Sequence, residues 1–316
     1  MDEMANEERE DKFEIRILTK TSTGLKKYFL DALEKEKFLP ALDDIECYLA
    51  CDPTSLLVGE LNGKPIAIAA AFKYEEQYSH FGCYVVDEAY RGQGYGLKIT
   101  TEARRRSEPD GVETGYTVPE MLENYKKMCM AVPHWPVEQH MVDVPNALTL
   151  LNDGTSTNGG ASLVVDIKQV GEIDVKSVCN YDTKIFGYKR EKFLERLLQV
   201  SHARVAVSQQ NEIVGYAAAR VLYKPDSGYK VGPVFGESFE IAKSLLKEIF
   251  QEIMECGRSS KKTVVINFPV VVNPDANKLA KLLCGKILMK CMFVSCNGLP
   301  KSDFTKWFAI TTLDAG

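Results

Sequence analysis

The sequence of 316 residues predicts an α/β protein built from two similar halves. From residue 14 onward, apolar runs with strand character alternate with segments of helical spacing. After a stretch rich in Gly, Ser, Thr and Asn at 152–162, the same order of elements recurs. A strand, a glycine loop and a helix follow one another at 81–106 in the first half. We therefore expect an α/β (α+β) fold with two mixed, mostly antiparallel sheets, each flanked by helices.

The composition is that of an ordinary globular protein, with 45% hydrophobic and 26% charged residues. A net charge of -5 disfavours nucleic acid as a partner, because such partners select a concentrated basic face. It weakly favours a cationic small substrate. The sequence has no run of about 18 apolar residues and no apolar signal segment, so we expect no membrane partner and a cytoplasmic location. The oligomeric state is not defined by these patterns.

The cysteines give little reason to expect a metal or a disulfide framework. There are nine of them, an odd number, and none of their spacings is Cys-x-x-Cys. Only four histidines accompany them. The pattern favours free thiols in a reducing compartment and predicts no zinc site.

The first half is predicted to span residues 13–151, after an acidic tail at 1–12 without a periodic apolar pattern. Asn62 and Gly63 stand between two apolar runs and predict a β-hairpin, because both central residues of its turn need positive φ. The stretch 152–162 is predicted to be a linker and 163–316 the second half.

The loop that follows strand 81–86 contains glycines at three alternate positions, Gly92, Gly94 and Gly96. Glycine lets the backbone turn with its N–H groups inward and leaves no Cβ to block a ligand. At a helix N-terminus, free N–H groups and the positive end of the dipole form a cradle for a pyrophosphate. The spacing departs from the dinucleotide fingerprint at Leu97 and from the P-loop, which needs Gly-Lys-Ser/Thr. A glycine-rich connection without a ligand is the alternative.

The strand, the acidic turn and Arg-Gly-Gln-Gly-Tyr-Gly entering a helix resemble the acyl-CoA loop of the GNAT superfamily of N-acetyltransferases, whose signature is Gln/Arg-x-x-Gly-x-Gly/Ala. The order of elements from 14 to about 145 resembles that fold as well. The resemblance implies that the loop amides hold the pyrophosphate of acetyl-CoA and that the preceding strand binds its pantetheine arm. The implied cofactor-binding residues are Val85, Val86, Arg91, Gly92, Gln93, Gly94, Tyr95 and Gly96.

The same resemblance implies a base, His80, which lies eleven residues before Arg91. The arylalkylamine branch of the superfamily has a catalytic histidine at the corresponding place, and an imidazole with a pKa of about 6.5 suits a base near neutral pH. A partly exposed histidine at a strand end is the plain alternative. Glu75 and Glu76 at the hairpin end could act through a water or select a cationic amine, or they are simply solvated.

The implied general acid is Tyr125, in a helix where GNAT enzymes often place a tyrosine that protonates the leaving thiolate. The usual Tyr-x-x-x-Gly-Phe ends here in Cys129 and Met130, so the local turn departs from the family pattern. A tyrosine that only packs is the alternative. Cys83 and Cys129 lack a histidine or acid at fixed spacing and are expected to be buried and inert.

The second half lacks the features of the glycine loop. Pro233 stands at a loop position where a backbone N–H donor would be useful, and proline has none. Glu237 stands beside a helix start that Ser238 is expected to cap. Ala280 occupies the position of the tyrosine. This half resembles the C-terminal domain of certain tandem GNAT proteins, which has lost the CoA motif. We expect it to cover the acceptor side of the first half.

These patterns together predict a tandem GNAT protein with one acyl-CoA site in its first half. The expected reaction moves the acetyl group of acetyl-CoA to a primary amine of a small molecule, by direct attack in a ternary complex. Two other functions stay open at this point: a non-catalytic acyl-CoA-binding protein and an acetyltransferase that modifies proteins.

Overall fold

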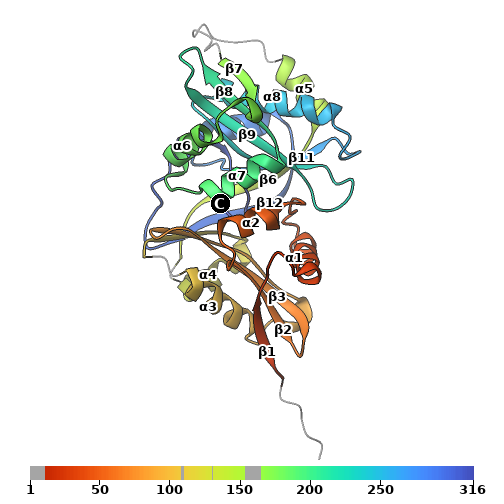
Figure 1. Ribbon diagram of the computed structural model, residues 1–316, viewed down its shortest axis with the longest axis vertical. Coiled ribbons are helices and arrows are strands. Elements are labelled where there is room, and N and C mark those ends of the chain that lie inside the picture. Colours follow the sequence, from red (N-terminus) through yellow and green to blue (C-terminus); the bar gives the residue numbers. More distant parts are fainter. Residues whose placement is uncertain (1–10, 108–109, 130, 154–164) are drawn as a thin grey trace, which may run out of the picture.

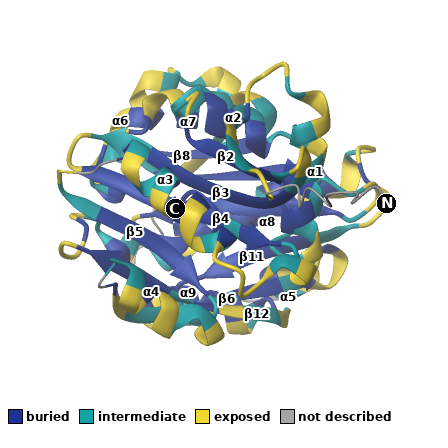
Figure 2. Cartoon of the chain, turned by 90° about the horizontal axis from the view of Figure 1, so that it is seen from below, coloured by how far each residue is buried: buried dark blue, intermediate teal, exposed yellow. Residues whose placement is uncertain are grey.

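The structure is a computed structural model that describes residues 11–107, 110–129, 131–153 and 165–316. In these residues one mixed sheet of 13 strands runs through both halves of the chain. Most of the first half, red to yellow in Figure 1, forms the lower part of the molecule, and most of the second half, green to blue, forms the upper part. Figure 2 shows the buried strands in the middle and helices whose outer sides are exposed.

The elements of the first half follow one another in the order β1 (Phe13–Ile17), α1 (Thr23–Lys35), α2 (Asp44–Cys51), β2 (Leu56–Leu61), β3 (Lys64–Glu75), β4 (Tyr78–Val86), η1 (Glu88–Tyr90), α3 (Tyr95–Ser107), β5 (Val112–Thr117), η2 (Pro119–Met121), α4 (Leu122–Cys129), β6 (Val132–Asp143) and α5 (Val144–Asp153). Those of the second half are β7 (Val165–Gln169), η3 (Val170–Glu172), α6 (Val175–Phe186), α7 (Glu191–Val200), β8 (His202–Ser208), β9 (Ile213–Val221), β10 (Tyr229–Gly236), α8 (Phe239–Glu255), β11 (Thr263–Phe268), α9 (Pro274–Leu282), β12 (Lys286–Cys296), η4 (Phe304–Lys306) and β13 (Trp307–Ala309).

The two halves repeat the same order, from β1 to β6 and again from β7 to β12. The predicted hairpin at Asn62 and Gly63 is confirmed: it joins β2 to β3, and both residues have positive φ, 52° and 81°. Its counterpart between β8 and β9 contains Asn211 with φ of 63°. The α/β class and the internal repeat are therefore as the sequence predicts.

The halves exchange one strand each. The strand order is β1-β2-β3-β4-β5-β12-β6-β11-β10-β9-β8-β7. β12 of the second half pairs antiparallel with β5, β6 of the first half pairs antiparallel with β11, and β6 and β12 pair with each other. The two expected sheets are thus joined into one, because each is completed by a strand from the other half. After β6 the chain continues as α5, which lies beside α8 in the upper part of Figure 1.

The apolar core has one shared part and two local parts. The shared cluster lies between the sheet and α1, α2, α6 and α7, and it includes Phe29, Tyr48, Phe186 and Phe193. A second cluster packs beneath α3 and α4, and a third beneath α5, α8 and α9. Because apolar area removed from water is the main stabilising term, a core that crosses the junction joins the halves energetically as well as topologically.

The segment 310–316 is buried between the halves, and the C-terminal residue lies near the middle of Figure 1. It runs so close to β4 that a Cβ at Gly82 would stand 2.2 Å from the carbonyl oxygen of Asp314. The Tyr74 hydroxyl donates to the carbonyl oxygen of Ala315 at 2.6 Å. The second half therefore packs directly on the strand that leads to the glycine loop.

Two sequence predictions fall mainly outside the described residues. Of the expected tail at 1–12 the structure describes only 11 and 12, and of the expected linker at 152–162 only 152 and 153, which end α5. The boundaries 13–151 and 163–316 stay predictions. Within the described part of the chain, every helix is too short or too polar to cross a bilayer.

Candidate active site

β4 and β5 run in parallel and pair over their first residues, from Tyr78 to Phe81 on β4, and then separate. An irregularity in β4 accompanies the separation: Cys83 has φ of 53°, and the register against β3 shifts between Ile68 and Ala70. A bulge of this kind bends the strand and increases its twist. The sheet therefore opens beyond Phe81.

A cavity of about 550 Å³ lies at this opening, a size typical of sites for small organic ligands. Its described walls come from the first half alone: the end of α1, β4, the glycine loop, β5, η2 and α4. The lining residues are Glu36, Phe38, Tyr84, Val85, Val86, Tyr90, Arg91, Gly92, Gly96, Tyr116, Thr117, Val118, Glu120, Met121, Asn124 and Tyr125.

The three loop glycines are required for two different reasons. Gly92 and Gly94 have φ of 77° and 83°, a left-handed region that strains other residues. Gly96 instead makes a close approach, since a Cβ there would stand 2.2 Å from the Tyr84 hydroxyl oxygen. The first pair shapes the loop, and Gly96 lets α3 pack on β4.

The loop leaves backbone donors free at the start of α3. In the described chain no acceptor receives the N–H groups of Gly92, Gln93 and Gly94. They stand directly before a helix of 13 residues, whose N-terminal end carries partial positive charge. Unpaired donors and the dipole together favour an anion here, and the Gly92 side of the loop faces the cavity.

Arg91 fixes the loop to its surroundings. Its Nε donates to the carbonyl oxygen of Val86 at 2.8 Å, and its Nη2 forms an ion pair with Glu36. The arginine thus joins the end of β4 to the end of α1. Both partners line the cavity, so this pair also builds part of its wall.

Tyr125 reaches the cavity from α4 and is 6% exposed. Its ring packs edge-on against Phe81, with centroids 6.0 Å apart. Burial raises the pKa of the hydroxyl well above its usual range, so the group is protonated at neutral pH. The cavity wall therefore includes a protonated phenol.

His80 does not reach the cavity. Its ring is fully buried, its Nδ1 lies 2.9 Å from the Thr114 hydroxyl oxygen, and that oxygen lies 2.8 Å from the Tyr78 hydroxyl. Burial lowers the pKa of the imidazole to about 3. The imidazole packs beside the ring of Tyr116, which does line the cavity; the two ring centroids are 5.6 Å apart.

Some of the residues predicted for the site line the cavity and others do not. Those that line the cavity are Val85, Val86, Arg91, Gly92, Gly96 and Tyr125. Gln93, Gly94 and Tyr95 do not line it: the Gln93 amide donates to the carbonyl oxygen of Ala89, and Tyr95 packs on Phe13.

Sequence reasoning missed most of the cavity wall. Phe38, Tyr84, Tyr90 and Tyr116 give it an aromatic surface, and their sequence context carries no motif. Glu120 is an exposed carboxylate on the wall to which the described structure gives no partner. The alternative candidates at the hairpin end lie elsewhere, and Glu75 accepts a backbone N–H from the second half.

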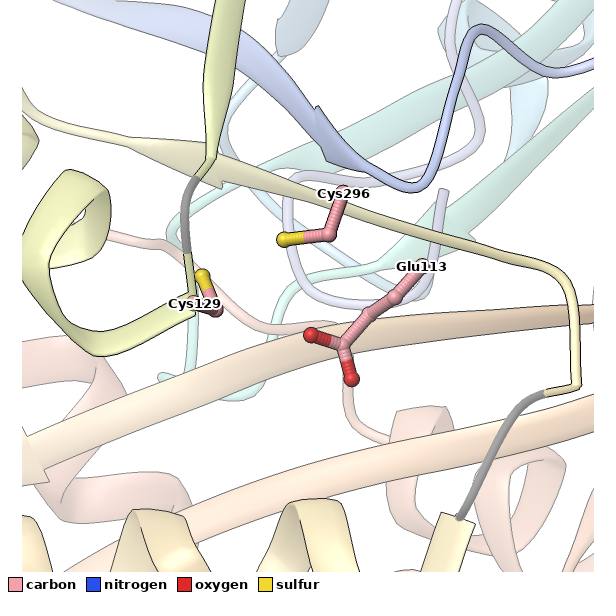
Figure 3. A group of neighbouring side chains, drawn as sticks. All are labelled: Glu113, Cys129 and Cys296. Carbon is pink, nitrogen blue, oxygen red and sulfur yellow. The ribbon is translucent and has the colours of Figure 1, made fainter.

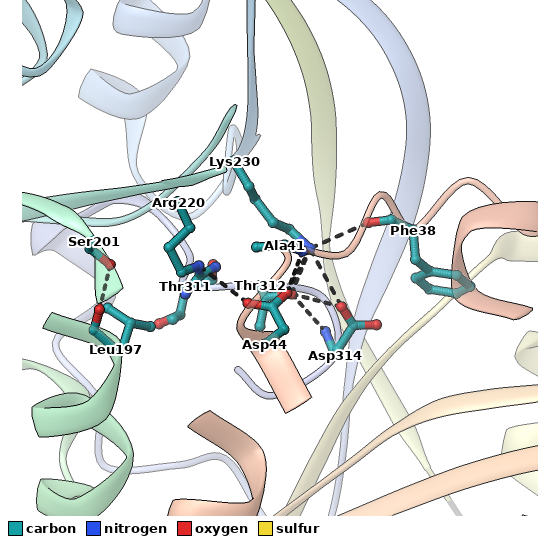
Figure 4. Close-up of polar contacts among 10 residues, drawn as sticks. All are labelled: Phe38, Ala41, Asp44, Leu197, Ser201, Arg220, Lys230, Thr311, Thr312 and Asp314. Atoms are coloured by element: carbon teal, nitrogen blue, oxygen red, sulfur yellow. Dashed lines mark hydrogen bonds and ion pairs between the residues drawn. The ribbon is translucent and has the colours of Figure 1, made fainter. Parts of the chain in front are cut away.

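A buried network of charges connects the second half to the cavity wall (Figure 4). Lys230 Nζ lies 3.0 Å from the Thr312 hydroxyl oxygen, 3.3 Å from the carbonyl oxygen of Phe38 and 3.5 Å from a carboxylate oxygen of Asp314. Arg220 Nε lies 3.2 Å from Asp44. Since each cation has a carboxylate partner, the buried charges compensate one another. The network holds Phe38 in place from the second half.

In the second half the corresponding opening is filled by β13. β10 and β11 pair in parallel at Tyr229 to Val231, as β4 and β5 do, but then β13 pairs with Val234 and Phe235 of β10. On its other side, Ile310 N donates to the carbonyl oxygen of Asn267 in β11. A strand therefore occupies the place that is a cavity in the first half.

The helix start after β10 is capped by the protein itself. Ser238 is the N-cap of α8, as predicted, and its hydroxyl accepts from Ile241 N at 3.4 Å. The neighbouring Glu237 carboxylate pairs with Lys306 at 2.7 Å. The second half has neither the free loop nor the opening that the first half has in the described chain.

Two family models match the chain and identify its family. One, described as "Acetyltransferase (GNAT) family", matches residues 22–121, and the other, described as "Acetyltransferase (GNAT) domain", matches residues 178–283. The chain therefore belongs to the GNAT superfamily of acetyltransferases and carries two GNAT domains in tandem, as the glycine loop and the repeat predicted. Membership supports acyl transfer in general.

Two curated proteins are related in sequence. The chain is 26% identical to holothin acyltransferase of Pseudoalteromonas sp. (strain SANK 73390) over 212 residues, 66% of each protein. It is 24% identical to an uncharacterized protein of Caenorhabditis elegans over 176 residues, 55% of this chain and 54% of that protein. The matches thus span less than two thirds of either relative.

Two solved structures share the whole architecture. A proposed acetyltransferase from Pyrococcus horikoshii superposes with a TM-score of 0.70 at 18% identity and covers 96% of both chains. A tandem GNAT protein from the clavulanic acid biosynthesis pathway superposes with a TM-score of 0.64 at 13% identity, over 92% of this chain and 100% of that one. At these identities the likeness concerns the fold alone.

Proposed function

We propose that this protein transfers the acetyl group of acetyl-CoA to a primary amine of a small molecule, by direct attack in a ternary complex. The observation that carries the proposal is the cavity between β4 and β5, which begins at a loop with free N–H groups. Family membership supports an acyl-CoA donor. The name of the related holothin acyltransferase supports a small molecule as the acceptor.

Two parts of the donor have candidate binding positions in the site. The pyrophosphate is assigned to the free amides before α3, and the pantetheine arm to the edge of β4 at Val85 and Val86, which has no strand partner on the β5 side. In the reaction the amine nitrogen attacks the thioester carbonyl, so a C–N bond forms and the C–S bond breaks. The leaving thiolate takes a proton, and Tyr125 is the donor on the wall.

The amine must also lose a proton, and two residues enter the proposal as the base. His80 comes from the family resemblance, but it is buried with a pKa lowered to about 3. Glu120 faces the cavity. Replacement of Glu120 by Gln distinguishes the two candidate bases. If Glu120 is the base, turnover falls while the affinity for acetyl-CoA is kept. If Glu120 is not the base, turnover is unchanged.

The second candidate function is a non-catalytic acyl-CoA-binding protein. The placement of His80 favours it, since the histidine that the family resemblance makes the base does not line the cavity. Such a protein would bind acetyl-CoA without releasing CoA in the presence of amines.

Mass spectrometry of free CoA and acetylated product decides between the two functions. The full chain is incubated with acetyl-CoA and a panel of aryl, alkyl and amino-sugar amines, next to a Gly94→Arg variant whose side chain obstructs the loop. Amine-dependent CoA release with one product class, absent in the variant, supports the enzyme. Acetyl-CoA binding without any acetylated amine overturns it in favour of the binding protein.

A further inference from the structure

Three side chains that can bind a metal converge on one point behind the cavity (Figure 3). Glu113 comes from β5, Cys129 from the end of α4 and Cys296 from the end of β12. The two sulfur atoms and a Glu113 carboxylate oxygen all lie within 4.8 Å of one another. They are far apart in the sequence, and Cys296 belongs to the strand that the second half contributes to the first.

A small space lies among these side chains. The cavity has a volume of about 10 Å³, and its walls include Glu113, Cys129 and Cys296 together with Tyr125 and Met128. This is about the smallest volume that admits one water molecule. The three side chains therefore border a space of the size that a small ligand such as one ion needs.

One oxygen of Glu113 is unpaired. The Glu113 side chain is 4% exposed, and its Oε1 accepts from Arg104 Nε at 2.7 Å. Its Oε2 is buried and has no hydrogen-bond partner. A buried carboxylate oxygen without a partner costs free energy, so its presence in a small space beside two thiols calls for a ligand there.

We propose that Glu113, Cys129 and Cys296 bind one zinc ion, with a water in the fourth position. Two thiolates and one carboxylate are ligands that zinc accepts, at about 2.3 Å for sulfur and about 2.0–2.2 Å for oxygen. Soft thiolates disfavour magnesium and calcium. On binding, the two thiols release their protons. Three ligand charges, the divalent ion and Arg104 then sum to zero.

Arg104 is the neighbour that orients the carboxylate. It donates to Oε1 and leaves Oε2 free for a ligand, and such outer partners commonly orient metal-binding side chains. The ion would join β5, α4 and the exchanged β12. Because α4 carries Tyr125, the site would also hold that helix against the sheet.

Cobalt binding tests the site without reference to catalysis. Reduced, chelator-treated full-length protein is titrated with Co²⁺, and the absorption of cobalt–thiolate charge transfer is followed. We expect one equivalent to give this band and Zn²⁺ to remove it. In Cys129→Ser and Cys296→Ser we expect the affinity to fall more than the ~10–100-fold typical of losing an outer partner. Cys284→Ser, which changes an exposed cysteine, is the matched control and should bind as the wild type does.

A second measurement uses wild-type protein, so it does not depend on whether the cysteine variants fold. Wild-type protein is alkylated with and without Zn²⁺, and peptides are mapped by mass spectrometry; Zn²⁺ should protect Cys129 and Cys296 but not Cys284. Absence of the cobalt band at stoichiometric metal overturns the site. So does a band that the variants keep, equal alkylation with and without zinc, or a Cys129–Cys296 disulfide that persists in metal-loaded protein.

Discussion

At the scale of single residues, Tyr125 offers the sharpest test of the proposed chemistry. Its raised pKa keeps the hydroxyl protonated, so the side chain can donate to a leaving thiolate at any ordinary pH. We expect Tyr125→Phe to lower kcat by about 10²- to 10⁴-fold, the usual range for a positioned acid or base, with acetyl-CoA affinity almost unchanged. Steady-state kinetics and calorimetric titration measure the two quantities. A Kd that weakens as much as kcat falls would assign the tyrosine to packing instead.

His80 makes a prediction about stability and pH. The folded pKa is about 3 and the ordinary value is 6.5, so between these limits the unfolded chain binds a proton that the folded chain does not. This histidine therefore stabilises the fold above about pH 6.5 and loses that contribution as pH falls toward 3.

Urea unfolding at several pH values compares the wild type with His80→Gln. We expect the free energy of unfolding of the wild type to fall more steeply below pH 6.5 than that of the variant, since the other groups cancel in the difference. If the free energies of unfolding of the two proteins change with pH in parallel, the imidazole takes up a proton in the folded protein as readily as in the unfolded one. His80 would then again be a candidate base.

The residue scale also shows where sequence reasoning works. Arg91 and the loop glycines were predicted because their function depends on local backbone geometry, which a short motif encodes. The burial of His80 was not, because it depends on β5 and on the segment 310–316, both distant in the sequence. Glu113 meets Cys296 only through the exchanged strand, so no spacing in the sequence could reveal the cluster.

At the scale of elements, the loop before α3 depends on its left-handed residues. Gly94 has φ of 83° and open space around its missing Cβ, so Gly94→Ala introduces backbone strain without a clash. We expect a loss of about 1–2 kcal/mol in stability, because that is the cost of a left-handed residue with a side chain, and weaker acetyl-CoA binding. Gly24→Ala in α1 is the control, with open space and no positive φ. Thermal unfolding and calorimetry compare them; equal effects of the two substitutions would contradict the argument.

The element β13 decides the number of acyl-CoA sites. It fills the opening between β10 and β11 whose counterpart in the first half is the cavity, and Ser238 closes the helix end beside it. Calorimetry should therefore give one acetyl-CoA per chain, and Gly94→Arg should abolish it entirely. Residual binding at a second, independent site would show that β13 leaves the second half open. The sequence predicted the missing loop, but a strand of three residues such as Trp307–Ala309 carries too short a pattern to predict.

At the scale of the whole molecule, the exchange of β6 and β12 makes the halves interdependent. The order of elements was predictable because apolar periodicity is local, and it suggested two separate sheets. Which strands pair is a long-range property that local periodicity does not encode: β12 pairs with β5, and β6 pairs with β11. The shared core around Tyr48 and Phe186 adds a second connection.

Interdependence predicts that the first half does not fold alone. A chain ending at residue 158 keeps every residue of the cavity wall but loses β12, so β5 becomes an unpaired edge and β6 loses β11 as well. Exposed edges of this kind promote aggregation. The truncated chain also exposes the apolar surface that faces α6 and α7.

We therefore expect the truncated chain to aggregate and to show no acetyl-CoA binding, whereas the full chain unfolds in one cooperative transition. Trp135 in β6 and Trp307 in β13 both pack on Phe304, so their fluorescence follows the junction, whereas circular dichroism follows the helices and strands of both halves. Coincident midpoints are the expected result, since a strand cannot leave one half without opening the other. Separate transitions, or a monomeric truncated chain that binds acetyl-CoA, would show instead that the halves are independent folding units and that β12 contributes little to the first.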